Sequence, residues 1–189
     1  MNVYDFDNTI YDGESVLDLF FFYVRRDPYL IKHIPRVFHA LAKYKAGKLT
    51  VEQAIERYAA FVEDYFSKIE DFDADAVEFW DGHMKNIKPF YAEIHREDDV
   101  IVTASPELSM NEICRRLDVK HCVGSVIDKE SGKVTRLCMR SKKVPAFLEA
   151  FPDAHIDNFY TDSPKNDAPL IEMADHAFLV KGNKIKQIK

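Results

Sequence analysis

The sequence predicts an α/β protein built on a parallel sheet, with a helical segment inserted between the first and second strands. Short apolar runs, such as Val100–Val102 and Ile156–Tyr160, end in polar residues and lead into amphipathic helix patterns. This order is typical of strand–helix units in a parallel sheet. Residues 14–87 follow helical spacing instead. The chain has 189 residues, of which 47% are hydrophobic, and this suits one domain with an insertion.

The first strand, at Val3 and Tyr4, ends in two acids, Asp5 and Asp7. Because side chains alternate along a strand, both carboxylates are expected on the same face. Like charges held this close repel unless a cation or a proton lies between them. A divalent metal would remove the conflict, leaving one carboxylate to attack and the other to transfer protons. We therefore predict a metal-assisted nucleophilic site; the alternative is a solvated Asp-rich turn.

The strand at residues 100–102 leads into two hydroxyl residues, Thr103 and Ser105, and then into a helix that starts near Pro106. Ligands of open α/β sheets bind beyond the carboxyl ends of the strands, where a Thr hydroxyl is able to contact an anion. Hydroxyl residues before a helix also serve as N-caps, and Ser105 fits that role. We assign the ligand contact to Thr103 and the cap to Ser105.

A further helix starts near Pro145 and is preceded by Lys142 and Lys143. Cations at a helix N-terminus oppose the helix dipole, so an anionic partner would stabilise one of them there. Lys143 lies next to the apolar face of this helix and is the better candidate to point inward. The alternative is that both lysines are solvated.

The strand at residues 156–160 is followed by two more acids, Asp162 and Asp167. Magnesium takes oxygen ligands and usually one or two carboxylates. We expect Asp162, which comes first after the strand, to bind the metal directly and Asp167 to support the metal site. Asp167 also fits the N-cap of the next helix, and one residue is able to serve both purposes.

Four short amphipathic helices account for the insertion. Ser15 with Asp18, and Thr50 with Gln53, have the sequence of capping boxes, and the last helix is expected from about Ala74 to Met84. Residues 25–48 carry seven Lys and Arg residues against one acid, Asp27. A solvated helix face is the first interpretation of this charge. The alternatives are steering of phosphate substrates, an acidic partner, or contact with an anionic membrane surface.

Taken in order, these groups resemble the four motifs of the haloacid dehalogenase superfamily: Asp5-Phe6-Asp7-Asn8-Thr9, a strand ending in Thr103, then Lys143, then an acidic pair. The chain is most similar to the phosphoserine phosphatase-like branch, in which an acid, here Glu14, follows the first motif closely. The acidic pair is one residue further apart than in the family pattern. Either Asp167 or Asn166 therefore supports the metal.

The resemblance implies a Rossmann-like three-layer core at residues 1–13 and 88–189 and a four-helix cap at residues 14–87. It implies that Asp5 attacks phosphorus, that Asp7 is general acid and then general base, and that Thr103 and Lys143 hold the phosphoryl oxygens. Mg²⁺ is implied as the cofactor, bound by Asp5, the Asp7 carbonyl and Asp162 with Asp167.

Three residues are expected to contact the substrate. The resemblance implies that Glu14 binds the amino group of the substrate, although the acid also suits a helix N-terminus. Asn8, within the first motif, is a second candidate. Arg57 lies on a predicted cap helix, where it would bind a substrate carboxylate; a solvated position is the alternative.

Composition argues against several other classes of protein. Cys114, Cys122 and Cys138 form no CxxC pair, so a reduced, cytoplasmic protein is expected, with no signal peptide before the first strand. The apolar stretch at residues 16–24 is shorter than the ~20 residues that span a bilayer, so no stable membrane insertion is expected. The net charge of −6 argues against nucleic acid as a partner. The oligomeric state is left open.

We therefore expect a magnesium-dependent phosphatase that acts on a small phosphorylated metabolite, with phosphoserine or a related amino-alcohol phosphate as the first candidate. The alternatives are a phosphotransferase of the same superfamily and a non-enzymatic phospho-acceptor module of a signalling system.

Overall fold

The computed structural model describes residues 1–50, 53 and 69–189, and its main feature is a seven-stranded sheet. Five neighbouring strands are parallel, and the two edge strands run antiparallel to the strands beside them. This confirms the predicted α/β class. In spatial order the strands are β4 (Val134–Arg136), β3 (His121–Ile127), β2 (Val100–Pro106), β1 (Asn2–Tyr4), β5 (Ile156–Thr161), β6 (Ala174–Lys181) and β7 (Lys184–Gln187).

The register of the central strand brings the predicted site residues to one edge of the sheet. Tyr4 on β1 is paired with Ile101 on β2 and with Tyr160 on β5. The residues that follow these positions, among them Asp5, therefore leave the sheet side by side at its carboxyl edge. The strand ends that the sequence predicts separately thus meet at one place.

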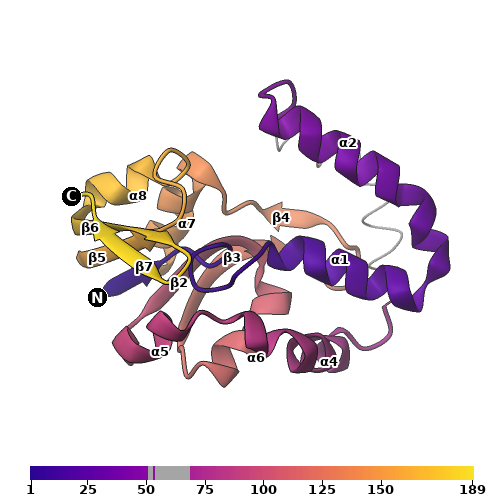
Figure 1. The fold of residues 1–189 in the computed structure, drawn as a ribbon, viewed down its shortest axis with the longest axis horizontal. Helices are drawn as coiled ribbons and strands as arrows, with labels where there is room; N and C mark the ends of the chain where they lie inside the picture. Colours follow the sequence, from indigo (N-terminus) through magenta and orange to yellow (C-terminus); the bar gives the residue numbers. More distant parts are fainter. Residues whose placement is uncertain (51–52, 54–68) are drawn as a thin grey trace. The chain divides into compact units, whose positions relative to one another are not determined.

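Helices cover both faces of this sheet, so the core has three layers. Figure 1 shows α4, α5 and α6 on one side of the strands and α7 and α8 on the other. The α6 and α7 helices both pack against β3, while α8 packs against β5 and β6. The bounds of these helices are α4 (Phe72–His83), α5 (Pro89–Ile94), α6 (Glu107–Arg116), α7 (Lys143–Ala150) and α8 (Ala168–Met173), with short 3₁₀ turns η2 (Met84–Asn86) and η3 (Arg140–Lys142).

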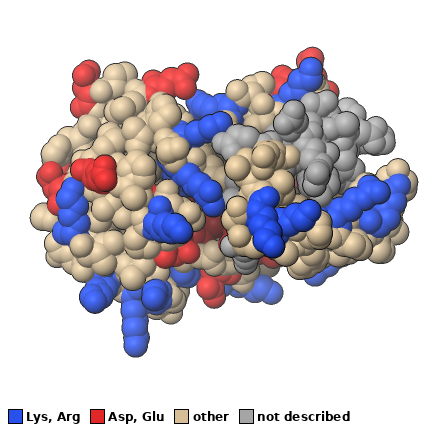
Figure 2. Space-filling view, turned by 90° about the horizontal axis from the view of Figure 1, so that it is seen from above, with Lys and Arg blue, Asp and Glu red and all other residues tan. Residues whose placement is uncertain are grey.

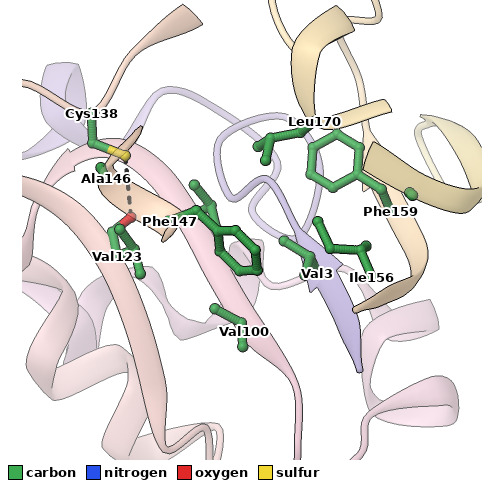
Figure 3. Packing of buried hydrophobic residues seen from close by; sticks show 11 residues of the cluster. Val3, Val100, Val123, Cys138, Ala146, Phe147, Ile156, Phe159 and Leu170 are labelled. Atoms are coloured by element: carbon green, nitrogen blue, oxygen red, sulfur yellow. Dashed lines mark hydrogen bonds between the residues drawn. The ribbon is translucent and has the colours of Figure 1, made fainter. Parts of the chain in front are cut away.

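The layer between the sheet and α7 is a dry aliphatic and aromatic core. Figure 3 shows Val3, Val100 and Val123, from three adjacent strands, facing Phe147 of α7. β-Branched side chains suit this position because they pack well on a pleated surface. Cys138 closes one side of this core, and its thiol donates to the carbonyl oxygen of Val123 at 3.5 Å. Deeply buried, it behaves as a small apolar residue.

The chain divides into two compact units, and the division differs from the expected boundaries at 13/14 and 87/88. The first unit holds residues 1–16, 71–127 and 134–189, and the second holds residues 17–70 and 128–133. The α4 helix, expected in the cap, belongs to the sheet unit because Trp80 anchors it there. The indole of Trp80 donates to the carbonyl of Ser109 at 2.7 Å and packs edge-on against Phe6.

The second unit holds helices, with α1 (Ser15–Arg26) leading into it, then η1 (Pro28–His33) and α2 (Ile34–Lys45), together with the turn at residues 128–133. The predicted capping box at Thr50 is confirmed: Thr50 N donates to Gln53 Oε1 at 3.0 Å, and Gln53 N donates to Thr50 Oγ1 at 3.2 Å. The helix predicted to follow it, with Arg57, lies outside the described residues. None of the described helices is long and apolar enough to cross a bilayer.

Candidate active site

Asp5 follows β1 directly and is nearly buried, with 8% of its surface exposed. Its backbone N–H donates to the carbonyl of Tyr160 at 2.9 Å, so the neighbouring strand fixes its position. Lys143 Nζ donates to Asp5 Oδ1 at 2.7 Å, and Thr9 Oγ1 donates to Asp5 Oδ2 at 3.3 Å. A cation and a hydroxyl thus hold the carboxylate that the sequence predicts to be the nucleophile.

Lys143 begins α7 and is 4% exposed, so it points inward as predicted and not into solvent. Its ammonium also lies 2.8 Å from Asp167 Oδ1, so it bridges two carboxylates. Burial alone would lower the pKa of Lys143, but the charges of Asp5 and Asp167 outweigh burial and raise it above its ordinary value. The lysine therefore stays cationic at neutral pH.

Asp167 is 2% exposed, and the contacts of its carboxylate are with Lys143 and Thr161. Thr161 Oγ1 donates to Asp167 Oδ2 at 2.6 Å. Asp167 stands at the N-cap position of α8, yet its side chain makes no capping hydrogen bond. The capping alternative is therefore wrong for the side chain, which instead positions Lys143.

Asp162 lies next to these groups, because its backbone N–H donates to Thr9 Oγ1 at 2.8 Å. Burial and the neighbouring acids raise the pKa of Asp162 to about 6. Burial also raises the pKa of Asp5 to about 6, although Lys143 opposes the shift. The ammonium of Lys143 thus bridges the carboxylates of Asp5 and Asp167, and its charge also acts on Asp162. The oxygens of these three carboxylates are the hard ligands that Mg²⁺ prefers. The donor set fits a divalent cation, which would offset the excess negative charge.

The raised pKa of Asp162 predicts that Asp162→Asn stabilises the metal-free protein at neutral pH. A group whose pKa rises from 3.8 to about 6 on folding favours its protonated form, so its stabilising contribution is lost as the pH rises through that range. After allowance for solvent screening, we expect a gain of about 1 kcal/mol in the free energy of unfolding at pH 7 and only a small fraction of that gain at pH 4. Urea unfolding in the presence of a chelator measures this gain in stability, with the exposed variant Asp153→Asn as control. If Asp162→Asn is less stable than the wild type at pH 7, burial and the neighbouring acids do not destabilise the charged form of Asp162.

Asp7 lies two residues beyond Asp5 and is held by two donors. Ser15 N donates to Asp7 Oδ1 at 2.7 Å, and Ser105 Oγ donates to Asp7 Oδ2 at 2.8 Å. The two serine hydroxyls are 2.9 Å apart. Burial raises the pKa of Asp7, although the hydrogen bonds from Ser15 and Ser105 oppose the shift. A carboxyl group that is oriented in this way and has a raised pKa suits proton transfer.

Ser105 does not have its predicted role. We expected it to cap the helix after β2, but the N-cap position of α6 is Pro106, which makes no side-chain cap bond. Ser105 is fully buried and orients Asp7 instead. Thr103 is also fully buried, and its Oγ1 accepts the N–H of Ser105 at 3.1 Å. That contact leaves the hydroxyl hydrogen of Thr103 able to donate to an anion at the strand end.

The predicted substrate residues Asn8 and Glu14 contact each other. Asn8 Nδ2 donates to Glu14 Oε1 at 3.0 Å, and the Glu14 side chain is exposed. Asn8 has a φ of 58°, a left-handed conformation that Asn tolerates better than most residues. Its backbone N–H donates to the carbonyl of Gly13 at 3.0 Å, which closes the loop between Asp7 and α1. Arg57 lies outside the described residues and stays a prediction.

Sequence reasoning missed Lys88, which precedes α5 and is only 5% exposed. Its ammonium donates to the carbonyl oxygen of Asn8. The negative charges of Asp12 and Asp162 favour its charged form. Burial lowers the pKa of Lys88 in spite of these two acids. Lys88 therefore fixes the strained backbone that follows Asp7. The lysine that precedes Pro89 was the available signal, but nothing in the sequence connects it with Asn8.

Lys88→Met should lower both stability and activity. A charged hydrogen-bond donor would be lost, which predicts a fall of about 1.5–3 kcal/mol in the free energy of unfolding. Turnover should fall because the loop after Asp7 loses its anchor. Thermal unfolding and phosphate release measure the two effects. The exposed Lys85→Met is the matched control, and equal behaviour of the two variants would contradict the positioning role.

Among the described residues, one group of three potential ligands has all its ligand atoms within 4.8 Å of one another: His155, Asp157 and Asp175. His155 and Asp175 are exposed, and Asp157 already accepts the N-terminal ammonium at 2.7 Å. Asp5 and Asp167 are instead bridged by Lys143. The predicted site therefore differs from this surface cluster in its burial, because Asp5, Lys143 and Asp167 are all less than a tenth exposed.

The chain belongs to the haloacid dehalogenase-like hydrolases, because the model of that family matches residues 3–172. This range holds every predicted catalytic and metal-binding residue, from Asp5 to Asp167. The family assignment thus agrees with the resemblance seen in the four sequence motifs. No curated protein matches the sequence.

Solved structures show the same fold. A protein of unknown function from Bordetella pertussis Tohama I has 21% identity and a TM-score of 0.77, over 94% of this chain and 87% of the other. A phosphoserine phosphohydrolase-like protein from Francisella tularensis SCHU S4 has 13% identity and a TM-score of 0.59, over 94% and 86%. A substrate-bound phosphoserine phosphatase has 15% identity and a TM-score of 0.55, over 93% and 82%. At such identities the likeness establishes the fold alone.

Proposed function

We propose that the protein is a magnesium-dependent phosphatase that hydrolyses a small phosphomonoester through an aspartyl-phosphate. The observation that carries the proposal is the division of roles between Asp5 and Asp7. Lys143 and Thr9 hold the first carboxylate at a strand end, whereas two serines hold the second and its pKa is raised. A nucleophile and a proton donor so close together are what a two-step phosphoryl transfer requires.

In the first step, an oxygen of Asp5 attacks phosphorus and the bond from phosphorus to the ester oxygen breaks. Asp7 gives its proton to the departing alkoxide, so that the alcohol leaves neutral. Lys143 and Thr103 would bind phosphoryl oxygens, and the contact of Asp167 with the Lys143 ammonium would keep the lysine oriented. The pairing of Asp5 with Lys143 keeps the nucleophile oriented before the substrate arrives.

In the second step, water attacks phosphorus, Asp7 takes a proton from that water, and the Asp5–phosphate bond breaks to release inorganic phosphate. Asp5 and Asp162, with the main-chain carbonyl of Asp7, would hold Mg²⁺. When bound, the ion supplies charge neutralisation for the phosphoryl group. It would also offset the burial and the neighbouring negative charges that raise the pKa of Asp5 and of Asp162.

Release of inorganic phosphate from a panel of phosphorylated metabolites tests the proposal. We expect many turnovers per protein with Mg²⁺ and none in chelator, and we expect Asp162→Ala to need more Mg²⁺. A single turnover that leaves the protein phosphorylated would instead indicate a phospho-acceptor module. Release of the alcohol together with transfer of phosphate to a second alcohol would indicate a phosphotransferase.

The proposed substrate is phosphoserine or a related amino-alcohol phosphate, and Glu14 is the residue that supports it. Its exposed carboxylate is anchored by Asn8, at the end of the loop that starts at Asp7. A substrate ammonium would form a charge-assisted hydrogen bond with that carboxylate. Burial of Glu14 is not needed, because a bound substrate would itself exclude water.

Glu14→Gln should therefore lower kcat/KM for amino-bearing phosphates by roughly tenfold or more, the value of one charge-assisted hydrogen bond. Turnover of an uncharged aryl phosphate should stay unchanged. Steady-state kinetics with both substrates measure the difference, and the exposed Glu93→Gln serves as control. An equal loss with both substrates would mean that Glu14 supports the loop and not the substrate.

A further inference from the structure

One side of η1 and α2 carries large apolar side chains that are more than half exposed. Tyr29, Ile31 and Phe38 are 59%, 54% and 52% exposed, although Phe38 also touches the ring of Phe21. The inner side of the same segment buries Leu30 and His33.

These apolar residues lie beside a basic row. Along α2 and the end of η1, the exposed residues Ile31, Pro35, Phe38 and Ala42 recur at helical spacing. Lys32, Arg36, His39 and Lys43 each follow one residue later, so they form a second row next to the first. The Lys32 ammonium also lies 3.1 Å from the centroid of the Tyr29 ring. We refer to these two rows, with Tyr29, as the η1–α2 face.

The charge on this face is not balanced by acids of its own segment. Residues 25–48 contain seven Lys and Arg residues and a single acid, Asp27. That acid has a structural role, because its Oδ1 accepts the N–H of Tyr29 at 2.9 Å and caps η1. In a chain of net charge −6, this segment therefore carries seven of the 26 Lys and Arg residues and a local excess of positive charge. Figure 2 shows several Lys and Arg side chains on the right-hand side of the molecule, where Figure 1 has α1 and α2.

An apolar row beside a cationic row is the pattern of helices that lie in the interfacial zone of a bilayer. Exposed apolar residues gain from contact with acyl chains, and Lys and Arg gain from anionic headgroups. A nucleic acid would bind the basic row, but it would leave the apolar side chains of Ile31 and Phe38 without a partner. We propose that the η1–α2 face docks the protein reversibly on the surface of an anionic lipid bilayer. This proposal is independent of the proposed phosphatase activity.

Co-sedimentation of the full chain with vesicles tests the docking. Vesicles of phosphatidylcholine alone are compared with vesicles that also contain phosphatidylglycerol, at low and high salt. We expect binding to the anionic vesicles to be at least tenfold stronger and to weaken as salt screens the charges. Absence of wild-type binding to the anionic vesicles would overturn the proposal.

Two double variants separate the two rows. Lys32→Glu with Arg36→Glu should abolish binding, and Ile31→Ser with Phe38→Ser should weaken it about tenfold. Lys184→Glu with Lys186→Glu makes the same charge change on the exposed strand β7 and should have no effect. Equal loss in this control, unaltered binding of the serine variant, or binding to an acidic protein in place of vesicles would each overturn the proposal. Circular dichroism confirms that each variant is folded.

Discussion

Asp5→Asn is expected to abolish phosphate release while leaving the fold intact. An amide does not form an aspartyl-phosphate, and loss of a covalent nucleophile costs several orders of magnitude in turnover. The substitution keeps the shape of the side chain, and Lys143 keeps its second partner, Asp167, at 2.8 Å. Folding should therefore not suffer from an unpaired buried cation.

Hydrolysis of an aryl phosphate measures this effect, with circular dichroism as the check on folding. Asp153→Asn, the same change on an exposed residue, is the matched control and should retain full activity. Substantial turnover by Asp5→Asn would exclude Asp5 as the nucleophile. Asp5 would then be a metal ligand and a partner of Lys143, but it would not attack phosphorus.

Asp7→Asn is expected to reduce turnover by about 10²–10⁴-fold, which is the usual contribution of a general acid–base group. The substitution should slow the hydrolysis of the aspartyl-phosphate more than its formation. An activated aryl leaving group departs without a proton, so Asp5 should still be phosphorylated. Attack by water on the aspartyl-phosphate lacks its base, so the phosphorylated protein should accumulate.

A burst of released phenol followed by slow phosphate release would show this accumulation. The substitution should leave the position of the side chain unchanged, because an amide oxygen is still able to accept a hydrogen bond from Ser15 N or Ser105 Oγ. Equal slowing of both steps would mean that Asn displaces the neighbouring groups and that the role of Asp7 is not proton transfer alone.

Much of the site could be predicted because its residues stand directly after strands. Runs such as Val100–Val102 are recognisable from composition, and the carboxyl ends of parallel strands meet at one edge of the sheet. Because Asp5 and Asp162 each follow a predicted strand, the sequence predicts both of them at this edge of the sheet. Lys143 was placed by the cost of a cation at a helix start, and its ammonium lies on Asp5.

Other features depend on contacts between distant residues, which local patterns do not contain. Ser105 resembles a helix cap in sequence, but its hydroxyl is used by Asp7, far away along the chain. Lys88 is an isolated lysine whose partner is the carbonyl of Asn8. The α4 helix has the spacing of a cap helix, and Trp80 assigns it to the sheet unit through the carbonyl of Ser109.

Trapping the phosphorylated protein tests the central claim most directly. Asp7→Asn is mixed with an aryl phosphate and Mg²⁺, quenched in acid within the burst, and digested for peptide mass spectrometry. We predict a phosphate on the peptide that holds Asp5, and none when Asp5 is also changed to Asn. Phosphate on a different residue, or released phosphate with no phosphorylated protein at any time, would contradict the account.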